Sequence, residues 1–178
     1  MRHSRPLWTT AALALAVLLV VGGEAWPRSR HSRQGSGRRP AEEWSRTTPP
    51  INVTHIFEGE INSRGKPVGF HSRPGGRDPQ GARVVCVVDR PNRAGVYTAE
   101  VEIRSGPDSG SAWLPKRSTL YPDRLSRDAV LQAALHAFAG RTTGNAEKFR
   151  GPSGEGFTIE GYYQNGRINT AYPIFTRD

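Results

Sequence analysis

Apolar and polar residues alternate along several segments after residue 80, and one segment there has the spacing of a helix. Val96 to Arg104 alternates with period two, which is typical of a strand with one solvent-facing side. Residues 83–89 form a β-branched run that predicts a buried strand. Loop residues at 90–95 join these two segments and indicate an antiparallel hairpin. Residues 105–115 are rich in Gly, Ser and Pro and are expected to form a loop.

Residues 126–139 are expected to form the helix. Ser126 can cap its N-terminus and Gly140 can end it. His136 falls outside the apolar stripe, so we interpret it as a surface residue. One helix among several antiparallel strands predicts an α+β fold, an antiparallel sheet with few helices. The stripe consists of Val130, Leu131, Ala134, Leu135 and Phe138.

The last segment, residues 156–174, has the clearest hairpin signal. Asn-Gly at residues 165–166 favours a two-residue type I′ turn, because both central positions of that turn have positive φ. The turn would place Gly161 opposite Thr170. We therefore expect space beside Thr170 in which a ligand could lie on the sheet.

The N-terminal part of the chain does not look like part of a folded core. Residues 1–25 combine a basic start with an uncharged apolar stretch of 15 residues, which predicts a signal peptide and a secreted protein. An uncleaved leader that anchors the protein to a membrane is the alternative. Residues 26–50 contain Arg, Ser, Gly and Pro with few aliphatic residues, so we expect a disordered linker. The folded domain is predicted to span residues 51–178.

The charge permits nucleic-acid binding without establishing it. The chain carries a formal charge of +9, but residues 1–50 hold 8 Arg and 3 acidic residues, which leaves +4 for residues 51–178. The chain has one cysteine, Cys86, so no intrachain disulfide can form. Its apolar neighbours favour a buried structural thiol over a catalytic one.

Two histidines sixteen residues apart, His55 and His71, are the candidates for chemistry. Imidazole titrates near neutral pH, so a pair can act as base and acid in one reaction, as RNA cleavage requires. A structural pair or a metal site is the alternative interpretation. Neither His nor Cys supplies a third ligand nearby, although Glu58 and Glu60 could contribute.

Three motifs in order resemble those of the bacterial EndoU endoribonucleases. The stretch from His55 to His71, HIFEGEIN followed by GKPVGFH, is similar to the family's paired-histidine motif. Residues 116–123, KRSTLYPD, resemble its lysine segment ahead of a Pro-Asp turn. Residues 161–173 resemble its closing Thr/Ser-x-Tyr strand. The resemblance covers residues 52–176, nearly the whole predicted domain.

The resemblance implies a barnase-EndoU-colicin-RelE-like α+β fold and RNA cleavage to 2′,3′-cyclic phosphate and 5′-hydroxyl ends. His55 and His71 would be the acid–base pair, with His55 as the base, and Lys116 would sit at the phosphate. No cofactor is required in this scheme, no metal ligand is implied, and stimulation by Mn²⁺ stays open. The implied substrate-binding residues are Ser118, which would help to bind phosphate, and Thr170 and Tyr172, which would contact the base and ribose.

The resemblance also implies partners. RNA would be the substrate, and a secreted antibacterial toxin of this kind would need a cognate immunity protein. Relatives are often the C-terminal module of a larger delivery protein, whereas here the domain follows its own leader and linker. No stable membrane association is expected once the leader is cleaved. An exported protein that binds RNA or another polyanion without cutting it is the alternative function.

Overall fold

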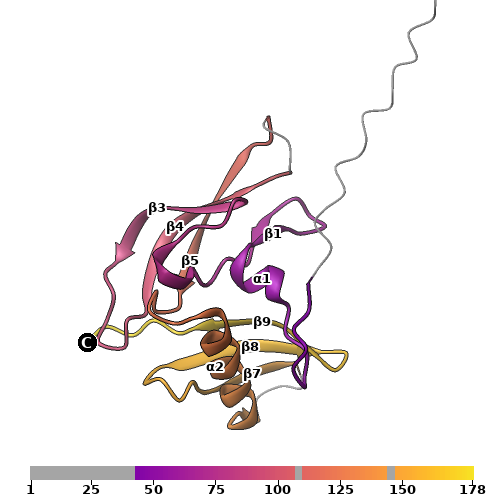
Figure 1. Cartoon of the computed structure of the whole chain (residues 1–178), viewed down its shortest axis with the longest axis vertical. Coiled ribbons are helices and arrows are strands. Elements are labelled where there is room, and N and C mark those ends of the chain that lie inside the picture. Colours follow the sequence, from indigo (N-terminus) through magenta and orange to yellow (C-terminus); the bar gives the residue numbers. More distant parts are fainter. Residues whose placement is uncertain (1–42, 107–109, 144–146) are drawn as a thin grey trace, which may run out of the picture. The chain divides into compact units, whose positions relative to one another are not determined.

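The computed structural model describes residues 43–106, 110–143 and 147–178 (Figure 1). The expected signal peptide and residues 26–42 of the expected linker lie outside the described residues. No helix within the described part is long and apolar enough to cross a membrane. Export and membrane anchoring therefore stay predictions.

Short antiparallel strands and few helices make up the described part, so the expected α+β fold is confirmed. The strands form a two-stranded sheet β1-β2, a three-stranded sheet β3-β4-β5 and a four-stranded sheet β6-β7-β8-β9. The elements are α1 (Val53–Phe57), β1 (Glu60–Ile61), β2 (Pro67–Val68), the 3₁₀ turn η1 (Pro74–Gly76), β3 (Ala82–Asp89), β4 (Tyr97–Arg104), β5 (Trp113–Leu120), α2 (Arg127–Ala139), β6 (Thr142–Thr143), β7 (Lys148–Pro152), β8 (Thr158–Gln164) and β9 (Arg167–Pro173).

The predicted helix is confirmed as α2, which packs on one face of the four-stranded sheet (Figure 1). The Ser126 hydroxyl accepts a hydrogen bond from the backbone N–H of Ala129 at 3.2 Å, and Gly140 ends the helix. His136 is exposed, as expected. The buried residues of α2 are Val130, Ala133, Ala134 and Ala137, and the other residues of the predicted stripe pack against the same core while partly buried.

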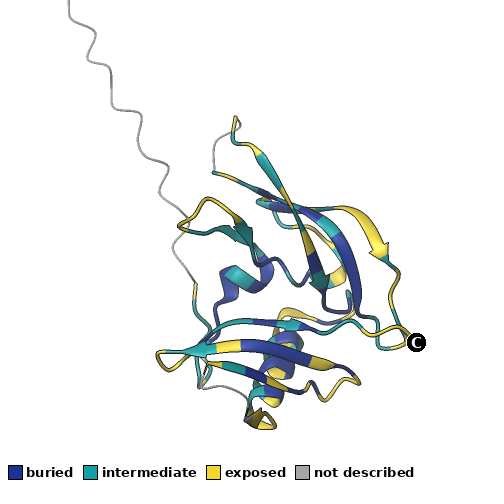
Figure 2. Ribbon diagram, turned by 180° about the vertical axis from the view of Figure 1, so that it is seen from behind, coloured by how far each residue is buried: buried dark blue, intermediate teal, exposed yellow. Residues whose placement is uncertain are grey.

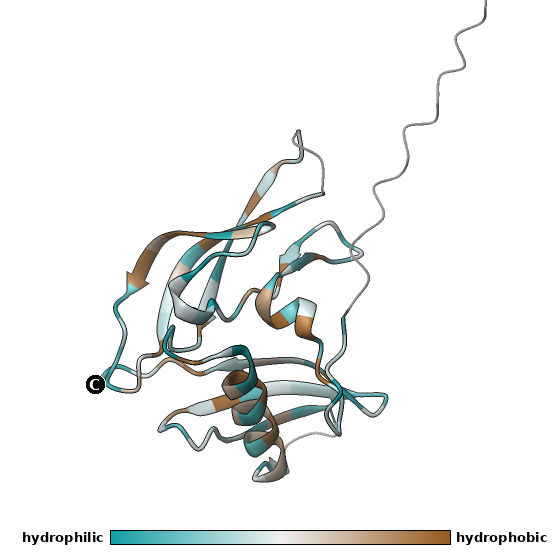
Figure 3. Cartoon of the chain, in the orientation of Figure 1, coloured by the Kyte–Doolittle hydropathy of each residue, from teal (hydrophilic) through white to brown (hydrophobic). Residues whose placement is uncertain are grey.

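Strand β3 is exposed, which corrects the expectation of a buried strand at residues 83–89 (Figure 2). Val85 is 56% exposed, Val87 is 48% exposed, and Cys86 between them is exposed as well. β3 is an edge strand with two register shifts against β4, and the apolar end that Figure 3 colours brown includes the exposed residues Val85, Val87 and Val88. The expectation of a buried thiol at Cys86 is therefore wrong. It rested on the β-branched neighbours of Cys86, and such residues occur in exposed edge strands as well as in buried ones.

Strand β5 begins at Trp113, inside the loop expected at residues 105–115. It pairs with the second strand of the confirmed β3-β4 hairpin over its whole length. Pro115 belongs to β5, which is an edge strand of its sheet, where the missing N–H of proline is tolerated. The Gly- and Pro-rich composition therefore concealed the start of the strand that carries Lys116.

The C-terminal hairpin is confirmed, but its expected register is wrong. Residues 165–166 form the turn with φ of 53° and 76°, as a type I′ turn requires. A bulge after Tyr162 shifts the pairing by one residue, so Gly161 faces Ala171 and Thr170 faces Tyr162. A side chain at Gly161 would collide with a core phenylalanine ring, so the space expected beside Thr170 does not exist.

The domain extends further towards the N-terminus than its composition predicts. The backbone N–H of Ser45 donates to the carbonyl of Ile51 at 2.9 Å, and Trp44 forms a β-bridge with Asn52. Residues 43–50, within the stretch expected to be a linker, are thus held against the domain. Backbone hydrogen bonds hold this segment in one conformation, which its polar composition does not predict.

Candidate active site

Edge strands of the two larger sheets and α1 converge at the candidate site. The backbone N–H of Tyr121, after β5, donates to the carbonyl of His71 at 2.8 Å. On the other side, the backbone N–H of Asn52 donates to the carbonyl of Ile168 in β9 at 3.0 Å. These bonds place α1 and the segment around His71 between β5 and β9, where they bring side chains from distant parts of the chain together.

Backbone hydrogen bonds at the C-terminal end of α1 hold the two histidines near each other. Asn52 caps α1, because its Oδ1 accepts from the backbone N–H of His55 at 2.9 Å. The carbonyl of His55 accepts from the backbone N–H of Phe70 at 2.8 Å, and that of Ile56 accepts from His71 at 2.7 Å. The imidazole ring centroids consequently lie 5.8 Å apart.

Gly69 makes this close approach possible. Its φ is +75°, a conformation that residues with a side chain rarely adopt. A Cβ built on Gly69 would lie 2.2 Å from the carbonyl oxygen of His55. The glycine in the paired-histidine motif therefore lets the two histidine segments touch through their backbones.

Each histidine uses its Nδ1 to bind an acceptor. The Nδ1 atom of His55 lies 2.8 Å from Oε1 of Glu60, and that of His71 lies 3.1 Å from the carbonyl oxygen of Thr119. Because a carbonyl can only accept, and a carboxylate does so at neutral pH, we assign the Nδ1 proton to both rings. Their Nε2 atoms are then the atoms left to exchange protons with a substrate.

The electrostatic surroundings of His71 keep its imidazole neutral. Burial lowers its pKa well below the usual 6.5, and the positive charges of Lys116 and His55 lower it further. The hydrogen bond to Thr119 acts in the opposite direction but does not offset these effects. A neutral imidazole whose proton sits on Nδ1 can accept a proton at Nε2.

Lys116 is a partly buried cation beside this ring. Its Nζ donates to the carbonyl of Gly69 at 2.6 Å and to Oγ of Ser118 at 3.2 Å. Burial lowers its pKa to about 8, so the ammonium group is still mostly protonated at neutral pH. An anion such as a phosphate would restore the interactions that this charge loses on leaving water.

Ser118 supports its neighbours and does not point towards open solvent. It is only 3% exposed, and its hydroxyl donates to the carbonyl of Phe70 at 2.8 Å. Its oxygen accepts from Lys116 and lies 3.1 Å from Nδ1 of His71. The hydroxyl thus helps to hold the lysine and the second histidine in place.

Tyr172 completes the cluster from β9. Its ring stacks on His71 with centroids 5.2 Å apart, and its hydroxyl donates to the buried carboxylate of Glu160. Burial raises the pKa of Tyr172, and Glu160 raises it further, so the phenol stays neutral. Thr170 lies two residues earlier on β9, and its hydroxyl oxygen is buried without a hydrogen-bond partner among the described residues.

The contacts above connect five of the six site residues predicted from the sequence, and the sixth, Thr170, shares a strand with Tyr172. Sequence reasoning missed the second carboxylate, Glu160, because its partners lie on two other strands, β7 and β9. Glu60 was considered as a metal ligand, whereas here it binds His55. No group of three or more His, Cys, Asp or Glu side chains that could hold a metal ion occurs in residues 43–106, 110–143 and 147–178.

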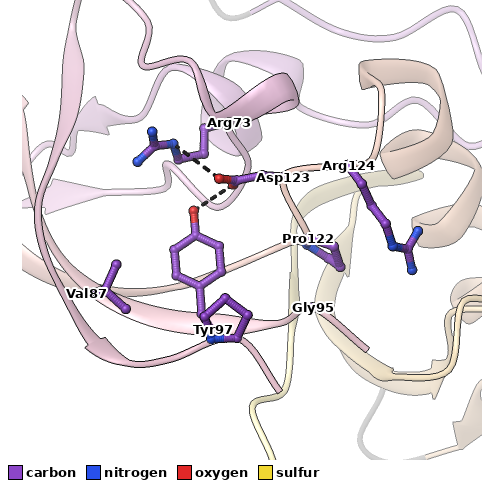
Figure 4. Close-up of a pocket in the computed structure, with 8 residues that line it drawn as sticks. Arg73, Val87, Gly95, Tyr97, Pro122, Asp123 and Arg124 are labelled. Atoms are coloured by element: carbon purple, nitrogen blue, oxygen red, sulfur yellow. Dashed lines mark hydrogen bonds and ion pairs between the residues drawn. The ribbon is translucent and has the colours of Figure 1, made fainter. Parts of the chain in front are cut away.

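A separate pocket of about 300 Å³ lies beside Tyr97 and does not include any of these residues (Figure 4). The Tyr97 hydroxyl donates to Oδ1 of Asp123 at 2.7 Å, and Arg73 lies 3.9 Å from the other carboxylate oxygen. The other charged side chain that lines the pocket, Arg124, pairs with Glu155 at 3.1 Å. We therefore place the chemistry at the histidine cluster and not in this pocket.

Comparison with known proteins identifies the family. A model of the family described as bacterial EndoU nuclease matches residues 51–175, and the chain belongs to this family. A Bacillus cereus protein named Toxin is 29% identical over 155 residues, which cover 85% of this chain and 28% of that protein. This chain therefore matches under a third of that relative's length. No solved structure matches the chain. The family predicted from the three motifs is confirmed.

Proposed function

We propose that this protein is an endoribonuclease that cuts RNA by transphosphorylation and leaves 2′,3′-cyclic phosphate and 5′-hydroxyl ends. Membership of a nuclease family supports this proposal. The observation that carries it is the pair His55 and His71, whose ring centroids lie 5.8 Å apart and whose Nδ1 atoms are both occupied. Two imidazoles whose Nε2 atoms are available at this separation suit a reaction in which one ring takes a proton from the substrate and the other gives one to it.

The environments of the two rings favour a division of roles opposite to the one that the family resemblance suggested. His71 has a lowered pKa and is neutral at pH 7, which suits the base. His55 has the Glu60 carboxylate at 2.8 Å, a counter-charge for the imidazolium that an acid must be. We therefore assign the base to His71 and the acid to His55.

The proposed reaction needs no bound group beyond these side chains. Nε2 of His71 takes the proton of the ribose 2′-hydroxyl, and the 2′-oxygen attacks the phosphorus. The bond from phosphorus to the 5′-oxygen breaks, and His55 gives its Nε2 proton to that oxygen. Lys116 stabilises the charge that develops on the phosphoryl oxygens. Tyr172 packs beside the ribose and base, and Thr170 hydrogen-bonds to the substrate after rotation about its χ1.

The test uses the full chain and a strand of deoxynucleotides that contains one ribonucleotide, with product ends identified by mass. We expect a single cut in EDTA that leaves a cyclic phosphate. His71→Ala and His55→Ala should each lower kcat about a hundredfold or more, as loss of an acid or base does. His136→Ala is the matched control, because His136 is exposed and lies outside the cluster.

Three results would change this proposal. Full activity of both histidine variants would remove the two-histidine mechanism. Cleavage that appears only after Mn²⁺ is added would show metal-assisted chemistry. Tight binding of RNA by a folded protein that never cuts it would support the alternative of a binding module.

We further propose that the protein acts as a secreted toxin that requires an immunity protein in the cell that makes it. The leader-like residues 1–25 and the relative named Toxin support this role. Expression in a bacterium with and without the leader, and with His71→Ala as the inactive control, tests it. Growth that is unaffected by an active enzyme inside the cell would contradict the toxin role.

A further inference from the structure

The four-stranded sheet has an outer face, opposite α2, that carries charged and aromatic side chains. On the inner face Phe149, Ile159 and Ala171 belong to the core. Successive residues of a strand point to opposite sides, so the neighbours of these core residues lie on the outer face. The strand register places these neighbours side by side across three strands. We call them the outer-face group: Lys148, Arg150, Glu160, Tyr162 and Tyr172.

Glu160 ties the outer-face group together. Its Oε1 accepts from Nζ of Lys148 at 2.8 Å, its Oε2 accepts from Arg150 at 2.7 Å, and the hydroxyl of Tyr172 donates to it as well. Burial raises the pKa of Glu160, but these three donors outweigh burial and lower it to about 2. One buried carboxylate therefore connects the ring beside His71 with two cations on β7.

Tyr162 exposes an aromatic ring next to these cations. Its side chain is 37% exposed, and Nζ of Lys148 lies 5.8 Å from its ring centroid. The other large apolar side chains that are exposed in the described part are valines of β3, on a different sheet. Surfaces that bind single-stranded RNA combine such exposed rings, on which bases stack, with cations that contact the backbone.

The charge of the outer-face group also suits a phosphate. Lys148 and Arg150 carry two positive charges against the single negative charge of Glu160, which leaves a net charge of +1. The Arg150 side chain is 60% exposed, so its guanidinium group is open to a ligand while it binds the carboxylate. Guanidinium and phosphate form strong charge-assisted hydrogen bonds.

The outer-face group is continuous with the candidate active site. Tyr172 of β9 stacks on His71, and neighbouring strands lie about 4.8 Å apart, so β7 is about 10 Å from β9. Sheet surfaces of similar width stack two or three bases in other RNA-binding domains. With the two nucleotides of the cleaved linkage bound at the histidine cluster, the next nucleotide of the strand can therefore reach Tyr162 and the cations of β7.

We propose that the outer face of β7 and β8 binds a nucleotide next to the two that the cleaved linkage joins. Tyr162 stacks on its base, and Arg150 with Lys148 contacts its phosphate. This inference rests on the proposed RNA cleavage and extends it, because it predicts that the enzyme prefers strands longer than a dinucleotide.

Two substrates with the same cleavable linkage separate the outer face from the chemistry. One is a dinucleotide with a single ribose, and the other is an eight-nucleotide strand whose remaining sugars are deoxyribose. We expect the full chain to have a higher kcat/KM for the longer strand. Tyr162→Ala should lower kcat/KM for the longer strand about tenfold or more, through KM, and should leave cleavage of the dinucleotide unchanged.

Matched variants show which property of the outer face matters. Tyr162→Phe keeps the ring and should behave like the unmodified protein. Arg150→Gln should weaken binding of the longer strand and reduce the salt dependence of that binding. Arg83→Gln is the control, because Arg83 is exposed to a similar extent and pairs with Glu102 on the three-stranded sheet.

The inference and the proposed function fail in different ways. Equal effects of Tyr162→Ala on both substrates, or no effect on either, would overturn the outer-face inference while cleavage stands. Binding of an all-deoxy eight-nucleotide strand, measured by fluorescence anisotropy, gives a readout independent of cleavage. If the protein cuts neither substrate but Tyr162→Ala weakens this binding, RNA cleavage is wrong and the binding surface stands.

Discussion

The imidazole of His71 packs against the phenol ring of Tyr172, with ring centroids 5.2 Å apart and ring planes inclined by 29°. His71 lies in the loop between β2 and η1, and Tyr172 lies on β9, about a hundred residues later in the chain. The hydroxyl of Tyr172 is held by Glu160, so the ring that limits the movement of His71 is itself fixed. The orientation of the proposed base therefore depends on a carboxylate on β8.

Removal of the Tyr172 hydroxyl tests this dependence. Tyr172→Phe keeps the ring but takes one donor from the buried Glu160 carboxylate, so we expect a loss of about 1 to 3 kcal/mol in the free energy of unfolding. Tyr172→Ala should also lower kcat, because His71 loses its packing partner. Urea unfolding and single-turnover cleavage measure the two effects. Equal kcat for the Phe and Ala variants would contradict the role of the ring.

The free energy of unfolding should decrease as the pH falls, and His71 should account for part of this decrease. Its pKa is lower in the folded protein than in the unfolded chain, so between these two values the unfolded chain binds more protons. The contribution is fully present above pH 6.5 and is lost as the pH falls towards the folded pKa. His71→Asn should therefore have a flatter dependence of unfolding free energy on pH between 7 and 5. Parallel curves for both proteins would contradict a depressed pKa.

Binding of phosphate should weaken above pH 8 because Lys116 loses its proton there. Its pKa is about 8 in the folded protein, and only the charged form attracts an anion strongly. Competitive inhibition of cleavage by inorganic phosphate, measured from pH 6 to 9, should fade in that range. Lys116→Arg keeps its charge at every pH tested, so its inhibition constant should change less. The same fade in both proteins would assign the titration to another group.

Gly69→Ala should be much more harmful than Gly65→Ala. Both glycines have similar positive φ values, +75° and +73°, so each substitution costs about 1 to 2 kcal/mol through the backbone alone. Only at Gly69 does the new methyl group also collide with the carbonyl of His55. Thermal unfolding compares the stabilities, and cleavage assays show whether the histidine pair is displaced. Similar losses in both variants would show that the close approach is unimportant.

Local signals predicted those parts of the fold that local interactions determine. The cap at Ser126, the glycine at 140 and the Asn-Gly turn at 165–166 act on neighbouring backbone, and all three are confirmed. Exposure of β3 depends on what covers a sheet, which no run of valines reveals. The order of residues 43–50 likewise depends on hydrogen bonds to distant backbone.

At the candidate site, too, the residue types could be predicted from the sequence but their partners could not. A histidine pair, a lysine and a Thr-x-Tyr pattern are visible as residue types, and the structure brings them together at the meeting of β5 and β9. The partner of each side chain is not visible in the same way. Glu160 looks like any polar residue of a strand, and its role becomes apparent only when β7, β8 and β9 are paired.

Because of the bulge after Tyr162, the number of residues between the turn and Thr170 constrains the site. It allows Ile168 and Ala171, an odd number of residues apart, both to enter the core, while Thr170 and Tyr172 remain on the outer face. If β9 continued from the turn in one regular register without this bulge, its two sides would be exchanged beyond Ile168, and the tyrosine would be buried in place of an alanine. Natural relatives that keep this site should therefore vary in the loops between strands but keep the spacing from the turn to Tyr172.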